Sequence, residues 1–201
     1  MPKLFLVRHG DTELNSAERY WGHTDVKLSD AGVRQAERLR HRLADEKIDA
    51  VYSSNLERAM VTARIIASEH QLAVTTCAEL KEVNFGNIEG LTFDDVNRLY
   101  PEVAKWWVER SPNLQYPGGE SRSQFNKRVS QFPDRLKKHT QEETILIVAH
   151  SGVLRTLMCQ LMGIEPHYMR QFRLNLASLS IMETYPTEAI LTLLNDVSHL
   201  A

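Results

Sequence analysis

The sequence predicts an α/β fold: a three-layer sandwich with a mainly parallel central sheet and helices on both faces. Short apolar runs that fit buried strands alternate with segments whose apolar residues recur at helical spacing. Strands joined through helices pair in the same direction and leave helices on both faces of the sheet. The chain has 201 residues, 42% of them hydrophobic, which predicts a single domain over residues 1–201.

The first half of the chain is expected to form two strands and two helices. The strands are the apolar runs at 3–7 and 48–54. The helices are at 28–46 and 55–70, where the apolar residues fall on one face at helical spacing. This alternation is typical of a parallel sheet.

The last third of the chain is expected to complete the sheet. A third strand is predicted at 143–152, followed by a helix at 153–163 that Gly163 would end. Two late strands, at 178–185 and 189–195, are separated by a Pro-Thr turn and are expected to pair as a hairpin.

The middle of the chain differs from the rest. Residues 84–120 are rich in glycine and proline and contain two adjacent tryptophans, which predicts an insert of short helices and loops that covers the sheet. Ligands in such folds bind beyond the carboxyl ends of the strands, under covering loops. A helix follows at 120–139, and Pro133 is expected to kink it.

Composition excludes several classes of protein. The net charge of −2 gives no electrostatic footprint for nucleic acid or an anionic membrane surface. No apolar run approaches the ~18 residues of a membrane span, and the first residues do not resemble a signal peptide. Cys77 and Cys159 lie in no paired motif, so they are expected to be free thiols in a reducing, cytoplasmic compartment.

Cationic and imidazole side chains follow the three main predicted strands. Arg8 and His9 end the first strand, Arg58 lies in the first turn after the second, and His150 ends the third. Parallel strands would bring these residues to one edge of the sheet. The helix after His150 would add free backbone N–H groups at its start. Such a pocket favours a phosphate group.

Each of these residues taken alone has a plainer interpretation. A histidine at a strand end is commonly a hydrogen-bonded structural residue, and an arginine early in a helix commonly lies at the surface. Two histidines could also belong to a metal site, but no close HxH or HxxxH spacing and no evident acidic third ligand accompany them. The joint pattern at three strand ends favours an anion site, with no metal and no cofactor.

Several motifs together resemble a known family. The segment "LVRHGDTELN" is similar to the RHG signature of the histidine phosphatase superfamily, which includes cofactor-dependent phosphoglycerate mutase. "VYSSNLERAMVTARII", "ELKEVNFGNIEG", "YPGGES" and "ILIVAHSGVLRTLM" also resemble family segments, in family order and over nearly the whole chain. The resemblance implies a phosphoglycerate mutase-like fold and chemistry on phosphorylated small metabolites.

The resemblance implies a role for each residue in the constellation. His9 would be the nucleophile, phosphorylated on a ring nitrogen, and must be neutral to attack. Glu82 would protonate the leaving group and later activate water, although Glu79 lies close enough in sequence to be the alternative acid. The phosphoryl oxygens would be held by four residues: Arg8, Arg58, His150 and Asn15.

Four further residues are expected to contact substrate. Gly22 and His23 lie on a loop that lines the substrate side of the site in the family. For His23 two interpretations stand, a substrate contact or an ordinary loop residue. Ser151 and Gly152 begin the helix whose N–H groups would face the phosphate.

The reaction expected is hydrolysis, by a metal-independent phosphomonoesterase. Phosphoglycerate mutases carry an "ERHYGxLxG" segment after the acid, and this chain reads "EVNFGNIEG" instead. The tail "LLNDVSHL" resembles the α-ribazole phosphatase branch of cobalamin biosynthesis, and Trp106, Trp107 and Tyr116 could stack a flat heterocycle or merely pack the insert. The alternatives are a sugar-phosphate phosphatase of broad specificity, a phosphoglycerate mutase, and a non-enzymatic protein that binds phosphorylated ligands; a homodimer is an open expectation.

Overall fold

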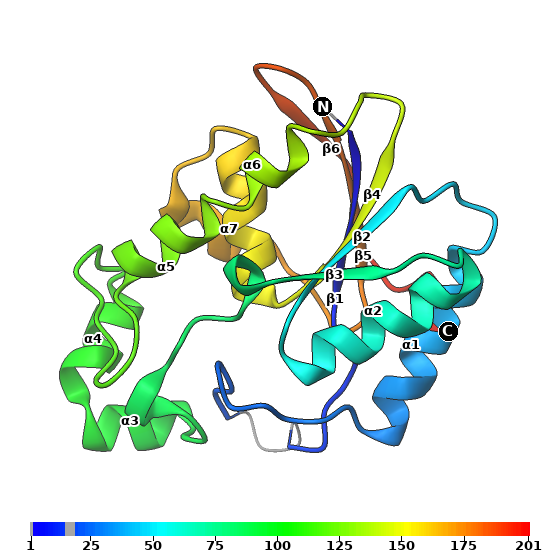
Figure 1. The fold of residues 1–201 in the computed structure, drawn as a ribbon. Helices are drawn as coiled ribbons and strands as arrows, with labels where there is room; N and C mark the ends of the chain where they lie inside the picture. The colour runs from blue at the N-terminus through cyan, green and yellow to red at the C-terminus, as the bar shows by residue number, and fades with distance from the viewer. Residues whose placement is uncertain (1, 15–18) are drawn as a thin grey trace.

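The computed structural model describes residues 2–14 and 19–201 and contains a central six-stranded sheet (Figure 1). Its strand order is β3-β2-β4-β1-β5-β6. The strands are β1 (Lys3–Arg8), β2 (Ala50–Ser54), β3 (Val74–Cys77), β4 (Thr144–Ala149), β5 (Leu179–Thr184) and β6 (Ala189–Asp196). Strands β3, β2, β4 and β1 pair in parallel, whereas β5 is antiparallel to both β1 and β6. The mainly parallel sheet predicted from the sequence is confirmed.

Helices cover both faces of this sheet. The helices are α1 (Asp30–Arg42), α2 (Glu57–Glu69), α3 (Phe93–Leu99), α4 (Pro101–Val108), α5 (Arg122–Val129), α6 (Pro133–Leu136) and α7 (Ser151–Leu161). Figure 1 shows α1 and α2 on one side of the sheet and α5, α6 and α7 on the other. This confirms the three-layer architecture.

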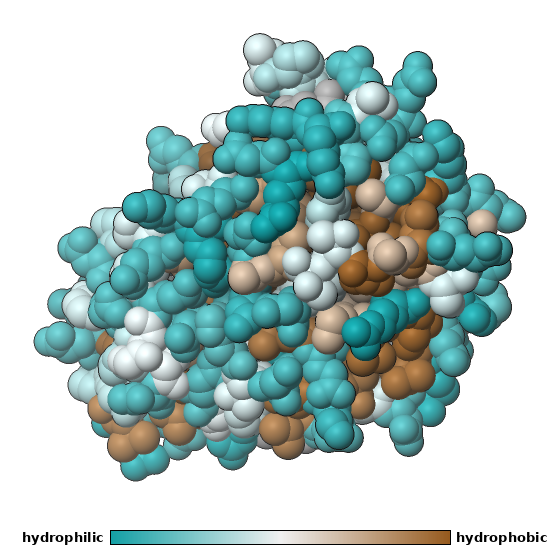
Figure 2. Space-filling model, viewed as in Figure 1, coloured by the Kyte–Doolittle hydropathy of each residue, from teal (hydrophilic) through white to brown (hydrophobic). Residues whose placement is uncertain are grey.

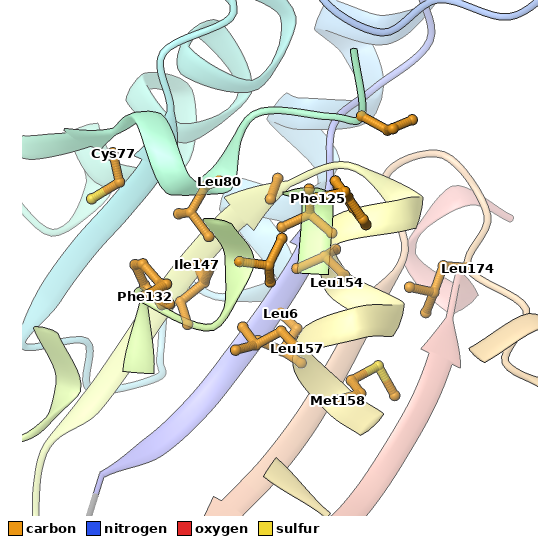
Figure 3. Close-up of a cluster of buried hydrophobic side chains, with 14 of the residues drawn as sticks. Leu6, Cys77, Leu80, Phe125, Phe132, Ile147, Leu154, Leu157, Met158 and Leu174 are labelled. Atoms are coloured by element: carbon orange, nitrogen blue, oxygen red, sulfur yellow. The ribbon is translucent and has the colours of Figure 1, made fainter. Parts of the chain in front are cut away.

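The side chains of β1 explain the three layers. They alternate between two hydrophobic clusters: Leu4 and Leu6 pack with the α5–α7 side, and Phe5 and Val7 pack with α1 and α2. Figure 3 shows Leu6 beside Leu157 of α7 in the first of these clusters. Each such side chain contributes about 1.5–3 kcal/mol through burial. The strand that carries the candidate nucleophile is therefore fixed from both faces.

Two elements differ from the sequence prediction. Strand β3 was not expected, because its sequence "VTTC" lacks an apolar run; it is an edge strand whose two threonines are exposed. The helix expected over 120–139 is broken rather than kinked: α5 ends at Val129 and α6 begins at Pro133. A proline lacks the N–H that would continue the helix and therefore starts a new one.

The segment 84–120 forms α3, α4 and connecting turns. Figure 1 shows α3 and α4 apart from the main helical layers, on the side toward which β1 runs. Trp107 fixes this segment internally, since its indole N–H donates to the hydroxyl of Tyr116 (2.7 Å) and its ring packs on Tyr20.

Figure 2 shows hydrophilic residues over most of the face seen in Figure 1. Within residues 2–14 and 19–201, none of the helices is both long and apolar enough to cross a bilayer.

Candidate active site

The two histidines and two arginines predicted from the strand ends lie together. The ring centroids of His9 and His150 are 5.1 Å apart, because β1 and β4 pair in register from Lys3 opposite Thr144 to Arg8 opposite Ala149. Arg8, His9 and Arg58 line one cavity of about 160 Å³ with Glu82 and Ser151. His150 is fully buried against His9 and does not itself line this cavity.

The imidazole of His9 is oriented by its own main chain. Its Nδ1 lies 2.7 Å from the carbonyl oxygen of Gly10, which can only accept, so Nδ1 carries the proton and Nε2 keeps its lone pair. The main chain of His9 is held in turn, because its carbonyl accepts from the N–H of Ala177 (3.1 Å). Burial, together with the charges of Arg58 and Arg8, holds the pKa of His9 well below its usual value. The ring is therefore neutral at pH 7, as a nucleophile must be.

His150 is held by a serine at the end of β2. Its Nε2 lies 2.9 Å from Ser54 Oγ, and that oxygen already accepts from the N–H of Leu56. If the Ser54 hydroxyl donates to Nε2, the ring proton of His150 is on Nδ1. That Nδ1 has no hydrogen-bond partner in the described part of the chain. His150 thus retains one N–H to donate to an anion. Burial and Arg58 hold the pKa of His150 well below its usual value.

Both arginines are held by main-chain carbonyls. Arg58 is 2% exposed and donates to the carbonyls of Gly22 (2.7 Å) and Thr24 (3.0 Å). Arg8 donates to the carbonyl of Leu174 (2.7 Å). Burial lowers the pKa of Arg8 to about 10, so its guanidinium stays positive at neutral pH. Carbonyls orient a guanidinium without neutralising it, which leaves both charges for a ligand.

The carboxyl group of Glu82 lies beside the first residues of α7 and lines the same cavity as His9. One carboxyl oxygen accepts from the N–H of Gly152 (3.1 Å) and the other from the N–H of Val83 (3.0 Å). A Cβ at position 152 would clash with this carboxyl group, so the close approach requires glycine. Glu79, the alternative acid, is instead paired with Arg135 (2.7 Å) and does not line this cavity. The geometry therefore favours Glu82.

The loop that holds Arg58 depends on Glu89, which the sequence analysis did not single out. The Glu89 carboxylate accepts from the N–H groups of Gly22 (3.1 Å), His23 (2.7 Å) and Thr24 (3.0 Å). The carbonyls of Gly22 and Thr24 then face Arg58. A lone glutamate before a glycine gives no local signal for this role, because its partners lie more than sixty positions away.

We expect Glu89→Gln to weaken both the fold and the site. A neutral amide presents one oxygen and an NH₂ group to a cluster of N–H donors, so about 1.5–3 kcal/mol of unfolding free energy should be lost. The turnover of a phosphate ester should fall with it, because Arg58 loses its fixed position. Urea denaturation and kcat/KM measure the two effects. Glu37→Gln, on the exposed face of α1, is the control; unchanged stability in Glu89→Gln would contradict this role.

Of the remaining residues expected to contact substrate, two line a cavity and two do not. Ser151 lines both cavities and Gly152 the larger one described below, as expected. Gly22 lines neither, but its carbonyl positions Arg58. His23 also lines neither cavity, and its ring hydrogen-bonds the main chain of Glu82 near the charges of Lys81, Glu120 and Arg128, which favours a structural loop residue over a substrate contact. Asn15 lies outside the described residues.

A second cavity, of about 400 Å³, adjoins the first. Tyr20, Glu82, Phe85 and Ser151 line both. Six aromatic side chains form part of the wall of the larger cavity: Tyr20, Phe85, Phe93, Trp107, Tyr116 and Phe125. Of the three aromatic residues expected to meet a heterocycle, Trp107 and Tyr116 are placed here, whereas Trp106 packs against the hydrophobic core and lines a separate surface groove.

The tail "LLNDVSHL" lines neither of these two cavities. Asn195 Oδ1 accepts from the N–H of Asn175 (2.6 Å), next to the Leu174 carbonyl that binds Arg8. The ring of His199 contacts the carbonyl of Ala177, whose N–H binds His9. The tail therefore supports the segment that binds Arg8 and His9. It does not contact either cavity in which a substrate would bind.

Because both buried histidines are neutral, we expect stability to depend on pH. Below pH 6.5 the unfolded chain binds protons that the folded chain does not, so the free energy of unfolding falls as pH falls. Each histidine should contribute about 1.4 kcal/mol per pH unit, down to its folded-state pKa. Chemical denaturation between pH 7.5 and 5.5 measures the slope. His150→Gln should reduce it, and an unchanged slope in that variant would contradict the assignment.

Metal ligands do not accompany the two histidines: in the part of the chain that the structure describes, no three His, Cys, Asp or Glu side chains are grouped to hold an ion.

Comparison with known proteins identifies the family. Residues 4–197 match the model of the histidine phosphatase superfamily (branch 1), and the chain belongs to this superfamily. Phosphoserine phosphatase 1 of Hydrogenobacter thermophilus is 33% identical over 200 residues, covering 100% of this chain and 95% of that protein. The adenosylcobalamin/alpha-ribazole phosphatase of Escherichia coli (strain K12) is 34% identical over 194 residues, 96% of each. The crystal structure of the alpha-ribazole phosphatase from Shigella flexneri matches with a TM-score of 0.89 at 34% identity, covering 96% of each chain. The family predicted from the sequence is confirmed, and these relatives bear the names of phosphatases.

Proposed function

We propose that this protein hydrolyses phosphomonoesters of small metabolites through a phosphohistidine formed on Nε2 of His9. One observation carries the proposal above the others: a neutral imidazole, protonated on Nδ1, lies in a small cavity with two guanidiniums that main-chain carbonyls hold in place. Phosphoryl transfer needs positioning and fixed positive charge more than any other contribution from the protein. Family membership supports the same chemistry.

In the first step, Nε2 of His9 attacks phosphorus and the bond from phosphorus to the ester oxygen breaks. Glu82, entering as the carboxylic acid, gives its proton to that oxygen, so an alcohol leaves rather than an alkoxide. Arg8, Arg58 and the N–H of His150 hold the three phosphoryl oxygens as negative charge spreads over them. The His9 ring keeps its proton on Nδ1, bound to the carbonyl of Gly10.

In the second step, water attacks the phosphorylated ring. The Glu82 carboxylate accepts a proton from that water, the bond from phosphorus to Nε2 breaks, and inorganic phosphate leaves. His9 is again a neutral imidazole and Glu82 again an acid, so the cycle closes. The segment after Glu82 adds no positive charge beside the intermediate, because it consists of Val83, Asn84 and Phe85. This favours transfer of the phosphoryl group to water over its transfer back to a bound substrate, as in a mutase.

The experiment that tests this proposal traps the intermediate. Rapid acid-free quenching of a reaction with 4-nitrophenyl phosphate should yield an acid-labile, alkali-stable phosphoryl group on His9, located by mass spectrometry. His41→Ala, an exposed histidine of α1, should label like the wild type. A phosphoryl group on any other residue, or interconversion of 2- and 3-phosphoglycerate without phosphate release, would overturn the proposal.

The leaving group is suggested by the larger cavity. Its aromatic walls support a flat ring such as that of α-ribazole 5′-phosphate, the substrate that the tail motif favoured. That tail lies away from the cavity, so the support for this candidate is the aromatic lining and the relatives named alpha-ribazole phosphatase. Comparing α-ribazole 5′-phosphate with fructose phosphates and 3-phosphoglycerate on one preparation tests it; a flat profile would reject it.

A further inference from the structure

Three arginines that the mechanism does not use line the larger cavity. Arg122 begins α5, Arg155 lies in α7, and Arg170 lies in the 3₁₀ helix Pro166–Gln171. Glu82 is the one acidic residue among the described residues of the cavity wall. The three positions come from segments far apart in the sequence, so the fold, and not a local charge run, brings them together.

Among the described residues, none of these guanidiniums forms a salt bridge. Arg170 donates to the carbonyl of Trp107 (2.8 Å), and Arg122 makes a long contact with the carbonyl of Arg110 (3.4 Å). The Nε of Arg155 is buried without a hydrogen-bond partner. Throughout the described ranges 2–14 and 19–201, no carboxylate lies within 4.0 Å of any of the three.

The arrangement has an electrostatic cost in the absence of ligand. Burial lowers the pKa of Arg155; the carboxylate of Glu82 opposes this shift, and the charge of Arg170 adds to it. Burial also lowers the pKa of Arg122, with Arg170 again acting in the same direction. Guanidiniums that repel one another around a cavity are stabilised when an anion enters, since each can donate in the plane of a carboxylate or phosphate.

We propose that the substrate carries a second anionic group, a carboxylate or a phosphate, which binds Arg155, Arg170 and Arg122 while the scissile phosphate occupies the smaller cavity. The inference rests on the proposed function and adds the substrate class. Tyr20 and Phe85, which line both cavities, flank the carbon skeleton between the two anions. α-Ribazole 5′-phosphate carries no second anionic group. It and a substrate with two anionic groups therefore predict opposite preferences for charge in the larger cavity.

Matched substrates test the inference. 4-Carboxyphenyl phosphate and 4-carbamoylphenyl phosphate have nearly the same shape and differ in charge, and 4-phosphonophenyl phosphate distinguishes a phosphate site from a carboxylate site. In the wild type, one of the two charged esters should have a kcat/KM about 10- to 100-fold above that of the carbamoyl ester. Arg155→Met and Arg170→Met should each bring this ratio toward one. Arg64→Met, on the exposed side of α2, should keep the wild-type ratio.

The outcomes separate the two proposals. If none of the three esters is hydrolysed, the proposed function fails. If all are hydrolysed at similar kcat/KM, or if the preference for charge survives in both Arg155→Met and Arg170→Met, the second anion site is rejected while the phosphatase stands. Urea denaturation of each variant identifies any that is unfolded, and because the preference is a ratio within one protein, partial loss of folded enzyme does not change it.

Discussion

Replacing His9 by alanine is expected to remove the phosphatase activity, with kcat/KM falling on the order of 10⁴-fold or more, as for the loss of other enzyme nucleophiles. The reason is covalent: without Nε2 no phosphoenzyme can form, and the guanidiniums alone do not supply a nucleophile. Initial rates with 4-nitrophenyl phosphate measure the loss. Phosphate binding should persist, because Arg8 and Arg58 are held by Leu174, Gly22 and Thr24 and not by the imidazole.

The control for this prediction is a surface histidine that lines neither cavity. His41→Ala should retain wild-type rates, since His41 lies on the exposed surface of α1. The folded state of His9→Ala can be checked by its stabilisation with phosphate, which should reach about 2.7 kcal/mol at 100 times Kd. A variant that binds phosphate and still turns over at the wild-type rate would remove His9 from the mechanism.

Replacing Glu82 by glutamine is expected to give the second largest loss. For an alkyl phosphate, formation of the phosphoenzyme should slow by about 10²–10⁴-fold, because the leaving alkoxide no longer receives a proton. For 4-nitrophenyl phosphate, whose leaving group is stable as an anion, the same step should slow much less. Single-turnover measurements of phosphoenzyme formation with both esters separate this step from the later attack by water.

Glu79→Gln is the matched control for Glu82→Gln. The two glutamates lie three positions apart, but Glu79 is paired with Arg135 and lies outside both cavities. Its replacement should leave the dependence on leaving group unchanged. If Glu79→Gln slowed the alkyl ester and Glu82→Gln did not, the acid would be assigned to the wrong residue.

Much of the candidate site could be predicted because it is built at strand ends. Arg8, His9 and His150 each follow a continuous apolar run, and parallel pairing of such runs brings their carboxyl ends to one edge. Arg58 follows from the same rule, because it lies in the first turn of the helix after β2. These predictions needed only the direction of the strands, which the alternation with helices supplies.

The parts that were missed depend on contacts distant in sequence or on weak local patterns. Strand β3 is short and half polar, so its pairing with β2 and not its composition defines it. Glu89 and the three arginines of the larger cavity have partners or neighbours brought together only by the fold. The tail motif resembles the α-ribazole phosphatase branch, but only the structure shows that it packs behind Arg8 and His9. A homodimer, a cytoplasmic location and the covering role of 84–120 stay predictions.

The place of β1 in the sheet has a consequence for how the protein is made. This strand is synthesised before the other five strands, yet both of its neighbours, β4 and β5, belong to the last third of the sequence. Until they emerge, the nascent polypeptide can assemble β2, α2 and β3 locally while the apolar "KLFLV" stretch stays unpaired and open to chaperones or to aggregation. Ribosome-bound intermediates should therefore be protease-sensitive at their amino-terminal strand and become resistant there only late in synthesis.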